Sequence, residues 1–73
     1  MTLSEGKIGK TYVVEEVHVD GPVTRRLEAL GVNEQTGIVI QNSKRNGALI
    51  IKVRGTRLAL GRRIADHIQV REA

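Results

Sequence analysis

The chain has 73 residues, which is enough for one domain over residues 1–73 and leaves no room for a second. Leu, Ile and Val supply 22 of the 73 residues, well above the roughly 20% below which chains tend to stay disordered. The first residues show no basic segment followed by an apolar one, and the longest apolar run, residues 48–51, is too short to span a membrane. The chain has no cysteine, which excludes disulfides and cysteine-based zinc sites and suits a cytoplasmic setting.

The net charge of +4 is unevenly distributed along the chain. Residues 1–36 carry four basic and six acidic side chains, whereas residues 37–73 carry eight basic and two acidic ones. A basic second half favours contact with an acidic protein surface or with phosphates. Tyr12 is the only aromatic residue, which disfavours binding of single-stranded nucleic acid by base stacking. Binding to duplex phosphates needs only charge and stays open as an alternative.

The first predicted elements are a strand over residues 11–19 and a helix over residues 22–31. The strand is rich in β-branched residues, and its imperfect alternation of apolar side chains predicts a bulge midway. Pro22 suits the first position of the helix. Gly31 suits its left-handed end, with Val32 folding back on Leu27. The apolar stripe that we expect to face the core consists of Val23, Leu27 and Leu30.

The second half of the chain predicts four more short strands. Apolar residues alternate around residues 38–40, 49–53, 58–60 and 68–70, separated by glycine-containing turns. A short helical turn is expected at residues 62–66. Five short strands with one inserted helix indicate a mainly β fold, in which a small and strongly bent sheet closes into a barrel.

The chain offers no arrangement typical of an enzyme. Residues 9–11 read Gly-Lys-Thr but lack the preceding strand and following helix of a phosphate-binding loop, so we expect no catalysis. Glu16, His18 and Asp20 alternate and would share one face of a strand, where their oxygen and nitrogen atoms suit Zn²⁺ or Fe²⁺. Because a tight site needs three or four convergent ligands, ordinary solvated side chains are the simpler explanation. We therefore expect no cofactor and keep metal binding as an alternative.

A candidate partner-binding surface lies on the outer side of the predicted sheet. Val39 and Ile50 have the parity opposite to the core residues, so they are expected to lie outside the barrel unless the helix covers them. An apolar centre with a basic rim is typical of protein interfaces. The surface that we predict consists of Val39, Ile50, Lys52 and Arg57, with Arg62 and Arg63 as a basic flank.

Two segments of the chain resemble the FeoA family. Residues 26–32 read Arg-Leu-Glu-Ala-Leu-Gly-Val, and residues 55–60 end in Leu-Ala-Leu after a glycine. Leu-Ser-Glu at residues 3–5 and the glycines near residues 9, 37 and 47 extend the resemblance over nearly the whole chain. It implies a small SH3-like barrel with an inserted helix and no catalytic motif.

The same resemblance implies a cytoplasmic accessory protein of bacterial ferrous iron uptake. Its implied partner is FeoB, a membrane permease with a cytoplasmic GTPase domain, and no insertion of this chain into the membrane is expected. A similar module ends the iron-dependent repressors of the DtxR type, which implies a metal-dependent regulatory role as the alternative.

Overall fold

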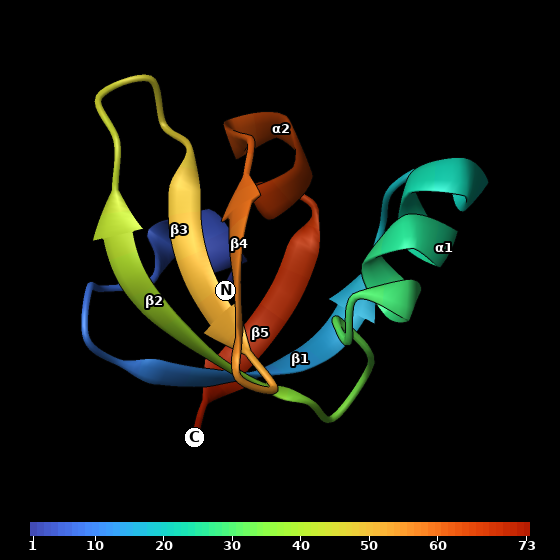
Figure 1. Ribbon diagram of the computed structural model, residues 1–73, viewed down its shortest axis with the longest axis horizontal. Coiled ribbons are helices and arrows are strands. Elements are labelled where there is room, and N and C mark those ends of the chain that lie inside the picture. The colour runs from blue at the N-terminus through green and yellow to red at the C-terminus, as the bar shows by residue number, and fades with distance from the viewer.

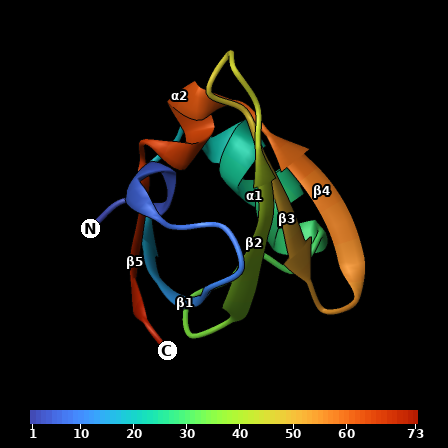
Figure 2. The ribbon, with the colours of Figure 1, turned by 90° about the vertical axis from the view of Figure 1, so that its left-hand side faces the viewer.

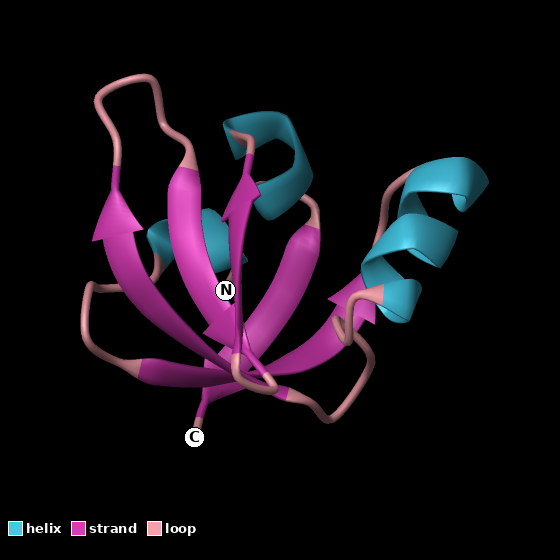
Figure 3. Cartoon of the chain, viewed as in Figure 1, coloured by secondary structure: helices cyan, strands magenta, loops and turns pink.

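The computed structural model describes all 73 residues, which form one five-stranded antiparallel sheet with two short helices (Figure 1, Figure 3). The strands lie in the order β4-β3-β2-β1-β5, which confirms the predicted mainly β fold. The elements in chain order are the 3₁₀ turn η1 (Leu3–Glu5), β1 (Thr11–Val17), α1 (Gly21–Ala29), β2 (Gly37–Ser43), β3 (Leu49–Val53), β4 (Thr56–Leu60), α2 (Arg62–Ala65) and β5 (Ile68–Glu72).

Two irregularities bend the sheet around its core. β1 shifts register between Val14 and Glu16 where it pairs with β5, and β2 shifts between Ile40 and Asn42 where it pairs with β3. Bulges of this kind increase local twist and curvature. The first of them is the bulge that the sequence predicts. β1 ends at Val17 rather than at residue 19.

The curved sheet does not close by hydrogen bonds. β4 and β5 are the two end strands and do not pair with each other, and Figure 2 shows them on opposite sides of the molecule. The SH3-like barrel is therefore open along one seam, and each end strand has an edge that no sheet strand occupies.

A single core of 14 buried residues fills the space inside the sheet. β3 shows the alternation that builds it, because Leu49, Ile51 and Val53 are buried while Lys52 is exposed. Full burial of one such aliphatic side chain contributes about 1.5–3 kcal/mol. The core consists of Leu3, Tyr12, Val14, Leu27, Val32, Ile38, Ile40, Leu49, Ile51, Val53, Leu60, Ala65, Ile68 and Val70.

Helix α1 ends as the sequence predicts, but one residue of its predicted apolar stripe does not face the core. Gly31 has φ +99°, its N–H donates to the Glu28 carbonyl at 3.0 Å, and the Val32 N–H donates to the Leu27 carbonyl at 2.9 Å. This pair of bonds is the expected Schellman end. The prediction that Leu30 faces the core is wrong, because Val32 joins Leu27 in the core and leaves Leu30 41% exposed.

Neither helix of the chain has both the length and the apolar character needed to cross a membrane.

Candidate functional site

The outer face of β2, β3 and β4 brings four of the predicted surface residues together. The strand register places Val39 opposite Lys52 and Lys52 opposite Arg57, so these side chains form one row across three strands. Ile50 lies two residues from Lys52 on the same face, opposite Ala59. Lys52 and Arg57 are exposed, and Val39 and Ile50 are half-buried, so α1 covers neither aliphatic side chain completely. We call Val39, Ile50, Lys52 and Arg57 the sheet-face row.

A shallow hollow of about 250 Å³ adjoins the sheet-face row at strand β4. It is lined by Ile50, Arg57, Leu58 and Ala59. Three of these side chains are apolar, and the arginine supplies the one charge. We call it the β4 hollow. An apolar floor beside a guanidinium suits an apolar side chain next to an acidic one.

The two predicted flanking arginines lie apart from this hollow, on α2. Arg62 lines a polar hollow that also contains Thr2, Glu5 and Asp66, and its Nε is 3.9 Å from the Asp66 Oδ2. Arg63 lines a different hollow, near the end of β1. The two arginines therefore face separate depressions, and neither of these is the β4 hollow.

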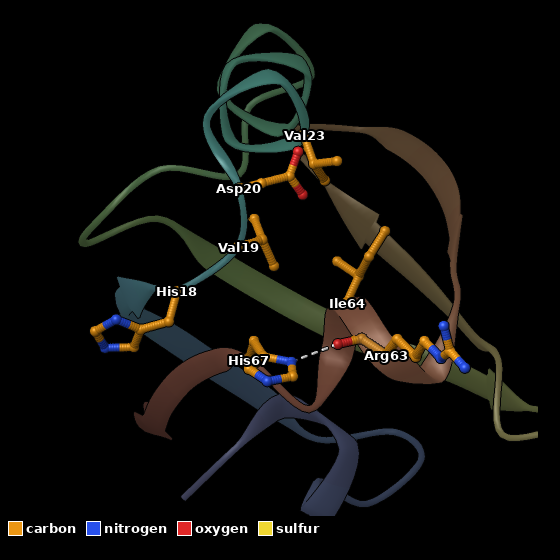
Figure 4. A pocket seen from close by; sticks show the side chains of 7 residues that line it. All are labelled: His18, Val19, Asp20, Val23, Arg63, Ile64 and His67. Carbon is orange, nitrogen blue, oxygen red and sulfur yellow. Dashed lines mark hydrogen bonds between the residues drawn. The ribbon is translucent and has the colours of Figure 1, made fainter.

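The three candidate metal ligands do not converge. The His18 Nε2 is 2.6 Å from the Glu16 Oε2, but β1 ends at Val17, so the strand does not continue to align Asp20 with them. Figure 4 shows His18 directed away from the hollow toward which Asp20 points. No three acidic, histidine or cysteine side chains are grouped so that they could hold a metal ion.

The sequence does not predict the hollow that Figure 4 shows, which has a volume of about 280 Å³. Residues 18–23 and 63–67 meet there, joined by a 2.7 Å bond from the His18 N–H to the His67 carbonyl. The His67 Nδ1 is 2.7 Å from the Arg63 carbonyl. A carbonyl only accepts, so the His67 Nδ1 carries a proton in this contact. Only the folded structure reveals this cluster, because the two segments are at least 40 residues apart in the sequence.

Comparison with known proteins identifies the family. The model of the FeoA domain matches residues 1–72. No match to this chain was found among curated protein sequences.

Several solved structures share the fold. The FeoA protein of Chlorobium tepidum is 29% identical, with 99% of this chain and 70% of that chain covered and a TM-score of 0.93. FeoA of Stenotrophomonas maltophilia, solved with zinc, is 32% identical over 97% of this chain and 89% of that chain, with a TM-score of 0.82. That protein is described as a prokaryotic SH3 domain protein with a suggested role in activating ferrous iron transport.

A manganese-dependent transcriptional repressor shares only the fold, at 17% identity and a TM-score of 0.90, over 100% of this chain and 41% of that chain. The FeoA match, in contrast, extends over all five strands and both helices. This chain therefore belongs to the FeoA family and has its SH3-like fold.

Proposed function

We propose that this protein is a cytoplasmic accessory protein of bacterial ferrous iron uptake that binds a FeoB-like membrane GTPase and permease. The observation that carries the proposal is the FeoA match over residues 1–72. The likeness to the Stenotrophomonas maltophilia protein, for which activation of ferrous iron transport is suggested, supports it. In this role the chain carries out no catalytic step and needs no resident cofactor.

The sheet-face row is the surface that we assign to this contact. Val39 and Ile50 supply a half-buried apolar centre, and Lys52 and Arg57 supply exposed charge beside it. Interfaces combine an apolar centre with a polar rim, and arginine is common among the residues that dominate binding energy. The charges call for an acidic partner surface, which they would attract before contact. Arg62 and Arg63 form a separate flank that adds to this attraction.

Charge reversal on the sheet-face row tests the proposal. In Lys52→Glu/Arg57→Glu, the affinity for the cytoplasmic domain of FeoB, measured by calorimetric titration, is expected to fall about tenfold or more, since both cations are lost from the interface. The matched control is Lys44→Glu/Arg45→Glu, in the exposed loop between β2 and β3. Both double variants change the net charge equally, so only a local contact separates them.

Charge reversal on the flank is expected to lower the affinity for the FeoB cytoplasmic domain less than charge reversal on the sheet-face row does. Arg62→Glu/Arg63→Glu should mainly slow association, because exposed rim charges act chiefly on encounter. Equal affinities for the sheet-face variant and its loop control, with both folded by circular dichroism, would remove the sheet-face row from the interface. No binding by the unsubstituted chain would contradict the proposed function itself.

A further inference from the structure

Strand β4 has an edge that nothing in the chain covers. It pairs only with β3, and it ends the strand order of the sheet. Figure 2 shows β4 at the outer margin of the molecule, with β3 on one side of it only. An unpaired edge presents a row of backbone donors and acceptors to which another chain can add a strand.

The turn before β4 determines which backbone groups face outward. Arg54 and Gly55 have φ +50° and +81°, as in the two-residue type I′ turn that closes a hairpin. Val53 and Thr56 flank this turn as a pair. The pair that flanks such a turn is hydrogen-bonded. Because hydrogen-bonded and non-hydrogen-bonded pairs alternate along an antiparallel ladder, the residues of β4 that bond to β3 are Thr56, Leu58 and Leu60. The N–H and C=O groups of Arg57 and Ala59 then point to the free edge, and no turn, loop or cap bond engages them.

The opposite edge of the sheet is covered by the start of the chain. Thr2 bridges to Gln69 of β5, and the Val70 N–H donates to the Met1 carbonyl at 2.8 Å. Proteins commonly cover or obstruct exposed sheet edges because free ones recruit other chains. Of the two end strands, β5 is covered in this way and β4 is not.

The chemistry beside β4 indicates what the edge accepts. Arg57 and Ala59 both lie on the outer face of the strand, where the β4 hollow offers an apolar floor of Ile50, Leu58 and Ala59. Lys52 is the cross-strand neighbour of Arg57. A second copy of this chain would bring a second net charge of +4 and another Arg57 to the same edge. Like charges repel there, whereas a carboxylate opposite Arg57 is attracted.

We propose that the β4 edge binds an extended segment of a partner protein as a sixth strand. The segment carries an acidic side chain opposite Arg57 and, two residues away on the same face, an apolar side chain over the β4 hollow. Backbone hydrogen bonds to Arg57 and Ala59 supply affinity, and these two side chains supply selectivity. The inference rests on the proposed function, because it states how FeoB would be held.

A proline at residue 59 tests this mode of binding. Ala59→Pro removes one outward N–H while leaving the bonds to β3 in place, and edge strands tolerate proline. The matched control is Ala59→Ser, which keeps that N–H and a small side chain. Affinity for the FeoB cytoplasmic domain should be about tenfold or more lower in Ala59→Pro than in Ala59→Ser, because both variants alter the side chain at this position and only the proline removes the N–H.

Amide hydrogen exchange gives a second readout that does not depend on the proline variant folding. In the parent chain the amides of Arg57 and Ala59 should exchange rapidly when free and slow at least about tenfold when FeoB is bound. Equal affinity of a folded Ala59→Pro variant, or unprotected amides in the complex, would overturn strand addition while leaving the proposed function intact. A dimer of the chain alone that Ala59→Pro abolishes would instead assign the edge to self-association. A parent chain that does not bind FeoB at all would remove the proposed function, and this contact with it.

Discussion

Gly6 lies where the N-terminal turn meets the core, and the position has no room for a side chain. A Cβ built there would be 2.8 Å from the Tyr12 Cε2 and 3.1 Å from the Leu3 carbonyl oxygen. Its φ of −71° is open to any residue, so the constraint is contact and not backbone conformation. Tyr12 is fixed in turn, because its hydroxyl accepts a 2.8 Å hydrogen bond from the Lys7 N–H.

Gly6→Ala is therefore expected to destabilise the fold by about 1–3 kcal/mol through overpacking. Gly37→Ala is the control, since the nearest atom to a Cβ there is the Thr11 Cγ2 at an ordinary 3.9 Å, and it should change stability by less than about 1 kcal/mol. Urea unfolding of both variants measures the difference. Equal stabilities would show that the N-terminal turn shifts freely to admit the methyl group. The sequence shows a glycine at this position but cannot supply the distances around it.

Among the elements of the fold, the N-terminal turn η1 is held by a single carboxylate, that of Glu5. The Thr2 N–H donates to the Glu5 Oε1 at 2.7 Å, and the Thr2 hydroxyl lies 3.1 Å from the same oxygen. The backbone bond and then the hydroxyl bond lower the pKa of Glu5 below its usual 4.5. Because residues 1–2 cover the edge of β5, this carboxylate helps to keep that edge covered.

The sign of the shift sets a pH dependence. A lowered folded-state pKa contributes stability that is present above the unfolded pKa and is lost as pH falls through the folded one. Glu5→Gln should therefore be less stable than the parent at neutral pH, and the difference should shrink as the pH falls below 4.5. Thermal unfolding of the two chains across this range measures it. A difference that stays constant into strong acid would show that Glu5 acts through its shape and not its charge.

The elements of this fold differ in how far the sequence predicts them. Local signals suffice for the end of α1, where Gly31 and Val32 supply the turn and the returning apolar residue, and for the alternation in β3. Leu30 has the right spacing for a buried residue, but it is exposed because the chain turns back at Gly31 and brings Val32 into the core. The ends of β1 and the meeting of His18 with His67 depend on pairing across the sheet, which no local pattern carries.

The basic residues of the whole molecule do not gather into one stripe. Lys52 and Arg57 lie on the sheet face, whereas Arg62 and Arg71 each have a carboxylate oxygen at 3.9 Å, from Asp66 and Glu15 respectively. A duplex binder must neutralise several phosphates at once. The count of eight cations in residues 37–73 therefore overstates the charge available to any one partner, because folding places acids beside some of them.

We accordingly expect no binding to duplex DNA in a gel-shift assay at about 50 mM salt, where phosphate contacts are strong. A shift that weakens steeply as salt rises would contradict this and restore nucleic acid as a partner. The sheet-face double variant Lys52→Glu/Arg57→Glu would then identify the responsible surface. Alternation along each strand is enough to predict that the sheet-face row lies on the outer face of the sheet. The open seam between β4 and β5, in contrast, follows from the strand order of the complete sheet.

The uncovered edge of β4 also creates a risk of aggregation while no partner is bound to it. A strand that can accept a partner can accept a misfolded neighbour equally well, and growth of such pairing leads to fibrils. Arg57, charged and exposed as the second residue of this short strand, opposes that growth because stacked copies would align their guanidinium groups. The same side chain would thus attract an acidic partner segment and disfavour pairing of β4 with another copy of the chain.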